Sequence, residues 1–476
     1  MKRIKLLTLT IALACAGSAG GAVGASSGVA AGPNGSWVGT YTVGRFSEIV
    51  VGVAGRRARV ALGGGHAGLQ TVAISNKSGR LRFQLPGAPP LVFNGRVTGA
   101  RFSGTVTHGA ARGTFRLARG TAPALVARGL FSGGGRTLAL VEDPYGPARV
   151  VDLDSGGVHA VYRSGTSFVI GAGFATREPT VGVARFEAAG ARVGDAAASR
   201  VPVRALEVRF ATTGATLSGT LTLPPGPGPH PAVAWVHGSG DTTRAYLPDL
   251  QALLLRHGVA VLAYDKRGVG QSGGRYPGES PTQAAIDTLA RDAAAATRFL
   301  ASRPEIDRTR VGLAGHSQAG WIIPLAASRE AATRFAIVFS GPAVTADEND
   351  LYQDLSGQGE TPATLSDEAI DADVLRAGPG GIDPVPWIRT MRVPALWLYG
   401  ALDRHIPPRL SARRLEPLAA EPGRDFTVAT FPKANHALVE TQTGLTSEML
   451  RSDTFAPGLF TRVGDWLRAH GLAAAA

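Results

Sequence analysis

Residues 311–321 of the chain are VGLAGHSQAGW. The apolar run Val311–Ala314 and the apolar residues after Ser317 predict a buried strand that turns sharply into a helix. Such a turn favours small residues two positions before and two positions after its central residue, and Gly315 and Ala319 stand there. Ala319 has one methyl group more than the usual glycine. Ser317 is therefore a candidate nucleophile, and the competing interpretation is a serine that caps a helix in an ordinary α/β domain.

Residues 200–476 alternate strand-like and helix-like segments around this stretch. AVAWVHG (232–238), VAVLAYD (259–265) and VPALWLYG (393–400) are continuous apolar runs, and predicted helices separate them. Continuous apolar strands separated by helices predict a mostly parallel sheet that is covered on both faces. An insert at about 346–390, rich in Asp, Glu, Gly and Pro, is in a position where a lid could sit.

The chain before residue 200 predicts antiparallel β-structure. Residues 33–125 contain segments such as GRLRFQLPG that alternate apolar and polar residues between glycine turns, which predicts a β-barrel or sandwich-like domain. A second β-rich segment is expected at 126–196, with a hairpin turn at Asp154-Ser155-Gly156-Gly157. The small and polar residues 194–200, GDAAASR, predict a flexible link to the α/β domain.

The first 31 residues predict a signal peptide, and therefore a protein that is secreted, periplasmic or bound to the cell envelope. The basic start KRIK (2–5) precedes the apolar run Leu6–Ala16, which is too short to span a bilayer and is followed by small residues. The only cysteine, Cys15, ends an ALAC sequence that is close to the lipobox of bacterial lipoproteins. A lipid anchor at Cys15 therefore competes with ordinary cleavage. No later apolar stretch is long enough to predict a transmembrane helix.

The charge distribution and the residue spacing argue against a nucleic-acid partner and against a metal site. The chain has 476 residues, 44% of them hydrophobic and 18% charged, which is enough to bury the cores of two or three domains. The formal net charge is +13, but the basic residues are spread along the chain and form no basic helix with interleaved aromatics. We therefore expect no nucleic-acid partner. No His, Asp or Cys cluster has the spacing of metal ligands, so we expect neither a metal nor another cofactor.

Ser317 needs a general base and an acid that orients it, because a serine hydroxyl is a weak nucleophile. Asp403 follows the strand at 393–400, and His436 in FPKANHAL follows a later predicted strand. Both positions are carboxyl ends of strands, where open α/β sheets gather their sites. The alternatives that the sequence leaves open are His405 and His470 as bases and Asp347 and Asp350 as acids.

Five segments carry a resemblance to a known family. In chain order they are HGSGD (237–241), YDKRGVGQSGG (264–274), AGHSQAGW (314–321), GALDRHIPP (400–408) and ANHAL (434–438). They resemble the signature segments of bacterial α/β-hydrolase esterases and serine aminopeptidase-like hydrolases. The resemblance covers roughly residues 200–476, and the β-rich region before it is similar to an accessory region of such esterases. The implied fold is an α/β-hydrolase fold preceded by an antiparallel β-rich region.

The resemblance also implies roles for individual residues. It implies a triad in the chain order Ser317, Asp403, His436. It implies an oxyanion hole made by the backbone N–H groups of Ser239 and Gln318. The residues expected to support these motifs without reacting are His237, Gly238, Gly240, Gly315, His316 and Ala319. Asp265 and Arg267 are expected to brace loops beside the site.

The leading interpretation is an exported serine hydrolase that cleaves a small carboxylic ester through an acyl-enzyme intermediate. A serine peptidase, of aminopeptidase or prolyl type, would use the same triad. Asp347, Glu348 and Asp350 in the insert could bind the amine of a peptide substrate, or they could form a solvated helix start. A third interpretation is a non-catalytic envelope-binding protein whose β-rich region carries the function.

Overall fold

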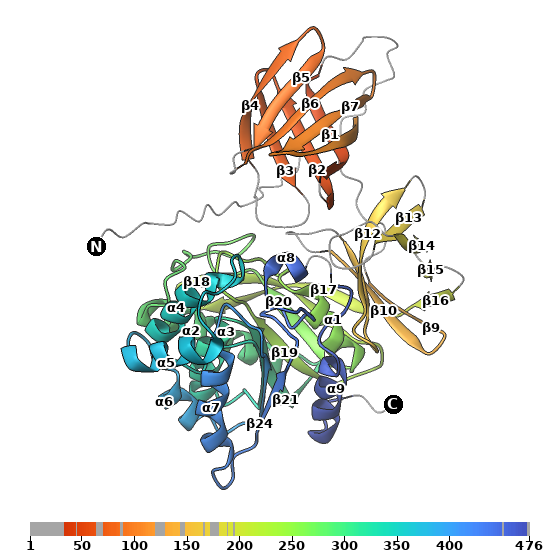
Figure 1. Cartoon of the computed structure of the whole chain (residues 1–476). Helices are drawn as coiled ribbons and strands as arrows, with labels where there is room; N and C mark the ends of the chain where they lie inside the picture. Colours follow the sequence, from red (N-terminus) through yellow and green to blue (C-terminus); the bar gives the residue numbers. More distant parts are fainter. Residues whose placement is uncertain are drawn as a thin grey trace. The chain divides into compact units, whose positions relative to one another are not determined.

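The computed structural model (Figure 1) describes residues 33–43, 45–62, 70–85, 89–119, 129–142, 148–164, 167–171, 180–187, 189–193, 196–449 and 452–473. The chain forms two compact units. One comprises Met1–Val126, Pro144–Ala148 and Ala160–Val183, and the other comprises Ala127–Asp143, Arg149–His159 and Ala184–Ala476. The signal-peptide prediction, Cys15 included, lies outside the described residues. None of the described helices is long and apolar enough to cross a membrane.

The first unit contains a closed antiparallel barrel of eight strands in chain order. Alternate residues of β5 point inward, where Leu81, Phe83 and Leu85 are buried and their neighbours are exposed. The rings of Phe83 and Phe93 stack at 4.8 Å inside the barrel. The interior is therefore a packed aromatic core. The strands are β1 (Gly35–Val43), β2 (Arg45–Ala54), β3 (Arg57–Leu62), β4 (Gln70–Lys77), β5 (Arg80–Leu85), β6 (Leu91–Thr98), β7 (Arg101–His108) and β8 (Ala111–Arg119).

Eight further strands are arranged as a second closed barrel. The prediction of a flexible link at 194–200 is wrong for Ala196–Arg200, which form β16 and pair with β15 and β9. The strand is largely exposed, and its side chains are small or polar. Backbone pairing with two neighbouring strands, rather than the β-propensity of its residues, makes it a strand. The strands are β9 (Gly129–Gly133), β10 (Arg136–Val141), β11 (Arg149–Asp152), β12 (Val158–Ser164), β13 (Ser167–Gly171), β14 (Thr180–Phe186), β15 (Gly190–Val193) and β16.

Residues 204–431 carry an eight-stranded sheet with the order β17-β18-β20-β19-β21-β22-β23-β24. Neighbours from β20 to β24 run parallel, and β17 and β18 are antiparallel. The apolar runs of the sequence form its buried interior strands, such as β23, in which every residue is buried. The strands are β17 (Arg204–Thr212), β18 (Ala215–Leu223), β19 (His230–Val236), β20 (Ala260–Tyr264), β21 (Ile306–His316), β22 (Phe335–Phe339), β23 (Ala395–Gly400) and β24 (Phe426–Phe431).

Helices cover both faces of this sheet (Figure 1). On one face Ile286, Ile322 and Ile388 join Trp397 of the sheet in one apolar core. On the other face the ring of Trp466 lies 6.3 Å from that of Phe335. The predicted fold class, a mostly parallel sheet between helices after an antiparallel β-rich region, is confirmed. The helices are α1 (Pro248–Arg256), α2 (Gln283–Ala301), α3 (Ala319–Arg329), α4 (Ala346–Ser356), α5 (Asp367–Ala377), α6 (Val385–Thr390), α7 (Pro408–Ala419), α8 (Thr446–Met449) and α9 (Leu459–Ala469), with a 3₁₀ turn at Gly357–Gly359.

A buried ion pair joins strand β11 to helix α1 within the second unit. Arg149 donates from Nε and Nη2 to the two carboxylate oxygens of Asp249, at 3.3 and 2.6 Å. The two side chains are only 6% and 2% exposed. Nearby, Gly157 and Thr454 form an antiparallel bridge. This part of the β-rich region is therefore packed against the α/β part of the same unit.

Removal of one partner of the buried pair should be strongly destabilising. Arg149→Met leaves the Asp249 carboxylate buried without its counter-charge, so we expect the free energy of unfolding to fall by about 3–5 kcal/mol. The matched control is Arg256→Met, whose 3.1 Å pair with Asp154 is 40% and 35% exposed and should cost no more than about 1 kcal/mol. Urea unfolding of both variants tests this, and equal losses would contradict it.

Candidate active site

Ser317 occupies a strained turn between β21 and α3. Its φ is +58°, a left-handed conformation that costs a residue other than glycine of order 1–3 kcal/mol. The Ser317 N–H donates to the carbonyl of Phe339 at 3.0 Å, which ties the turn to the end of β22. The residue in the N-cap position of α3 is Gln318, and no side chain caps the helix. This geometry fits a nucleophile elbow better than a helix-capping serine.

The close approach of three chain segments explains the small residues around Ser317. A methyl group on Gly315 would lie 2.4 Å from the carbonyl oxygen of Val236 and 2.7 Å from the Cβ of Ala319. Such distances are well inside van der Waals contact, so position 315 requires glycine. Since Gly315 has no side chain, the methyl group of Ala319 fits opposite it. The departure of Ala319 from the usual glycine is therefore accommodated in this turn.

Asp403 and His436 are brought together from loops that follow β23 and β24. Asp403 Oδ2 lies 2.7 Å from His436 Nδ1, although the two residues are 33 positions apart in sequence. Asp403 is fully buried, and its Oδ1 accepts the backbone N–H groups of His405 and Ile406 at 2.7 and 3.0 Å. Because His436 Nδ1 faces a carboxylate, it carries the proton, and Nε2 is left as the basic atom.

Burial sets the protonation states of this pair. It raises the pKa of Asp403 to about 6, in opposition to the His405 imidazole and the backbone N–H groups of His405 and Ile406, which lower it. Burial lowers the pKa of His436 below its ordinary value. At neutral pH the carboxylate is therefore ionised and the imidazole neutral, which are the forms that general-base catalysis needs.

His316, directly before Ser317, ties His436 to the loop after β19. Its Nε2 lies 2.8 Å from the backbone oxygen of His436, and its Nδ1 lies 2.8 Å from the hydroxyl of Tyr246. A carbonyl can only accept, so Nε2 carries the hydrogen and Nδ1 accepts from Tyr246. Burial lowers the pKa of His316 to about 3, which keeps the ring neutral. His316 is thus a structural link, and no pattern in the sequence pointed to its partner Tyr246.

The loop His237–Gly240 lies against Ser317. A methyl group on Gly238 would lie 3.2 Å from the Cβ of Ser317 and 2.4 Å from the Tyr246 hydroxyl oxygen, so a side chain there would displace Tyr246. The His237 ring packs edge-on against Tyr264 at 5.1 Å, and burial lowers its pKa to about 3. The structure therefore brings the segment that contains Ser239 and Gly240 next to the segment that contains Gln318.

The segment 264–274 braces this loop. Asp265 accepts the backbone N–H of Arg244 at 2.9 Å and its guanidinium at 3.0 Å. Arg267 donates to the buried Asp292 at 2.7 Å. The residue between them, Lys266, contacts the loop His237–Gly240 directly. Sequence reasoning missed this contact. The available signal was the rarity of lysine, because the chain has only five lysines among 49 basic residues.

The rival bases lie in different surroundings. His470 is at the end of α9, where Nδ1 lies 2.7 Å from the Trp466 carbonyl and Nε2 lies 3.1 Å from Asp425. The ring of His405 lies 4.8 Å from the ring of His436, and its backbone N–H, as described, bonds to Asp403. His405 is therefore a neighbour of the candidate site, and His470 belongs to the end of helix α9.

The acidic residues of the insert do not form one group. Asp347 and Asp350 are exposed on α4. Glu348 is buried, caps α4 with Thr345, and accepts from the guanidinium of Arg414 at 2.7 Å. The expectation of a solvated helix start therefore fits the two aspartates and is wrong for Glu348, which stabilises the helix start from inside.

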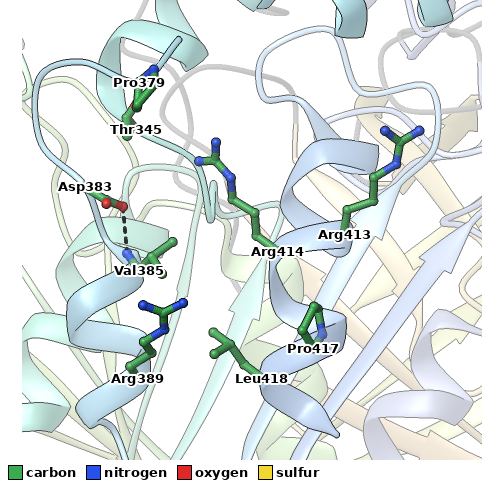
Figure 2. A pocket seen from close by; sticks show the side chains of 9 residues that line it. All are labelled: Thr345, Pro379, Asp383, Val385, Arg389, Arg413, Arg414, Pro417 and Leu418. Carbon is green, nitrogen blue, oxygen red and sulfur yellow. Dashed lines mark hydrogen bonds between the residues drawn. The ribbon is translucent and has the colours of Figure 1, made fainter. Parts of the chain in front are cut away.

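A surface pocket between α6 and α7 lies apart from these residues. Figure 2 shows the guanidinium groups of Arg389, Arg413 and Arg414 around it. Its lining residues are Thr345, Pro379, Asp383, Val385, Arg389, Arg413, Arg414, Pro417 and Leu418. None of them belongs to the elbow, to the loop after β19 or to the Asp403–His436 pair. Within the described part of the chain, no three His, Cys, Asp or Glu side chains are placed to hold a metal ion.

Known proteins share parts of this chain. Residues 227–361 match the family described as Serine aminopeptidase, S33. Esterase EstD of Thermotoga maritima is 25% identical over 250 residues, which cover 47% of this chain and 58% of that relative, so the chain spans less than two thirds of the relative's length. Among solved structures, the Pyrococcus furiosus esterase Pf2001 is 18% identical with a TM-score of 0.39, covering 56% of this chain and 91% of its own. A 2,6-dihydroxy-pseudo-oxynicotine hydrolase is 18% identical with a TM-score of 0.40, covering 57% and 70%.

The crowding at Gly315 predicts an asymmetric response to exchanging the two small residues. Gly315→Ala places a methyl group against the Val236 carbonyl, and we expect it to cost at least about 1–3 kcal/mol of stability. Ala319→Gly only removes a methyl group and should cost no more than about 1 kcal/mol through helix propensity. Thermal unfolding of both variants is the measurement. A Gly315→Ala protein as stable as the wild type would show that the turn is looser than described.

Proposed function

We propose that this chain, a member of the α/β-hydrolase superfamily, is a serine hydrolase that cleaves carboxylic esters through an acyl-enzyme intermediate. The observation that carries the proposal is the 2.7 Å contact between Asp403 and His436. The pair contacts the residue before a serine in a positive-φ elbow, because the ring of His316 lies 4.5 Å from that of His436. An acid and a base with shifted pKa values, close to a serine in a strained turn, form a pattern typical of acyl-transfer sites.

In the proposed reaction the Ser317 hydroxyl attacks the acyl carbonyl. His436 Nε2 takes the hydroxyl proton and returns it to the leaving alcohol. Water then attacks the acyl-enzyme with His436 again as base, which releases the acid and restores Ser317. Asp403 orients the imidazole and stabilises its charged form. The N–H groups of Ser239 and Gln318 stabilise the oxyanion of each tetrahedral intermediate.

Two observations bear on the choice between ester and peptide substrates. The curated relative is named an esterase, which favours esters. The family match at 227–361 is described as a serine aminopeptidase and makes aminopeptidase activity the second candidate. Of the three insert acids considered for binding an amine, Asp347 and Asp350 remain, because the Glu348 carboxylate is bound to Arg414. A panel of p-nitrophenyl esters beside aminoacyl p-nitroanilides separates the two.

Replacement of the proposed triad should abolish hydrolysis of the better substrate class. Ser317→Ala and His436→Ala should each lower kcat by about 10⁶, because nucleophile and base act as one unit, and Asp403→Asn should lose less, about 10⁴. His470→Ala is the matched control and should retain wild-type kcat. Labelling by a fluorophosphonate probe should disappear in Ser317→Ala. Loss of activity in His405→Ala with retention in His436→Ala would mean that the base is misassigned.

We propose in addition that the protein is exported. Support comes from residues 1–31, with their basic start, short apolar run and small residues. Mass spectrometry of the protein from the producing cell should find a mature chain that lacks at least residues 1–25. Detection of the intact N-terminus would contradict cleavage, and a diacylglycerol adduct on Cys15 would assign the protein to the lipid-anchored class.

A further inference from the structure

Lys266 lies buried behind the loop that follows β19. The residue is only 2% exposed. Nζ donates to the carbonyl oxygens of Gly238 at 2.5 Å and Gly240 at 2.8 Å, and it lies 3.4 Å from Oε1 of Gln318. An ammonium group has three hydrogens, so each can be matched with one of these acceptors. One cation thus connects the two segments that carry the proposed oxyanion donors.

The contact with Gly238 has a direct geometric consequence. The carbonyl of Gly238 and the N–H of Ser239 belong to the same planar trans peptide, so they point in opposite directions. A cation that holds the carbonyl oxygen therefore fixes the direction of the Ser239 N–H, away from Lys266. The positive charge beside the Gly238 carbonyl oxygen also polarises this peptide and strengthens the Ser239 N–H as a donor. The contact of Lys266 with the Gly240 carbonyl restrains the following peptide of the loop by the same geometry.

We infer that Lys266 is a positioning residue for the oxyanion hole, whose ammonium group orients and polarises the Ser239 N–H and holds the loop to Gln318. The inference rests on the proposed function, because it assigns a task to the same site. Lys266 itself is directed at backbone carbonyls and a side-chain amide rather than at a substrate. Its contribution should therefore appear only where negative charge develops on the acyl oxygen.

The charge on Lys266 depends on its surroundings. Burial lowers the pKa of Lys266 to about 7, and the carboxylates of Asp241 and Glu279 act in the opposite direction. The ring of Tyr276 lies 5.6 Å from Nζ. The other titratable groups near it are the neutral His237 and the ionised Asp265, which is bound to Arg244. Loss of the proton removes the charge and one donor, so rising pH should weaken the oxyanion hole.

Lys266→Met tests the inference, because methionine has a similar length and no charge. We expect kcat and kcat/KM for p-nitrophenyl esters to fall together by about 10²–10³, as for removal of one oxyanion donor, with KM little changed. The affinity for a trifluoromethyl ketone, which forms a tetrahedral oxyanion on the serine, should fall by the same factor. Lys77→Met, on the exposed end of β4, is the matched control and should change neither value.

A second measurement leaves Lys266 in place and so does not depend on how Lys266→Met folds. Glu279 is exposed and supports the charge of Lys266, so Glu279→Gln should move the alkaline limb of the kcat/KM profile to lower pH and leave the plateau unchanged. An unmoved limb would overturn the inference, as would a folded Lys266→Met protein with wild-type kcat. Absence of ester hydrolysis and of fluorophosphonate labelling in the wild type would instead overturn the proposed function.

Discussion

The candidate site depends on one steric constraint, the close approach of the backbone at Gly315 to the carbonyl of Val236. The two strands that carry these residues are neighbours in the sheet, with Val236 paired to Gly315 at their carboxyl ends. Because no side chain separates them, the chain can turn at Ser317 and place that residue against Gly238 at the end of the adjacent strand. The strain at Ser317 is therefore stabilised by ordinary sheet pairing on both sides, with Phe339 as the second neighbour.

The parallel part of the sheet then supplies the remaining groups, since the strands from β19 to β24 all end at the same edge. Asp403 and His436 follow β23 and β24, so their hydrogen bond forms although they are far apart in sequence. Arg149 of the β-rich region is paired with Asp249 in the first turn of α1, the helix that follows the loop with Tyr246.

Sequence patterns predicted the parts of this arrangement that depend on local order along the chain. The strand–turn–helix around Ser317 and the acid and base after later strands could be located because strand ends are visible as breaks in apolar runs. The roles of Tyr246, Lys266 and Arg149 could not, because each depends on a contact with a segment distant in sequence. The strand Ala196–Arg200 was missed for a related reason. Its composition is that of a linker, and only pairing with β9 and β15 makes it a strand.

The buried charges around the site have different consequences for the fold. Arg267 and Asp292, like Arg149 and Asp249, neutralise each other inside the protein. Lys266 has no carboxylate within ion-pair distance among the described residues, and its charge is instead solvated by carbonyl and amide oxygens. Burying a cation on neutral dipoles is costly, as its lowered pKa indicates. A purely structural role would be filled at lower cost by a neutral donor. If the proposed function holds, the negative charge that forms on the acyl oxygen during the reaction favours the charged form of Lys266.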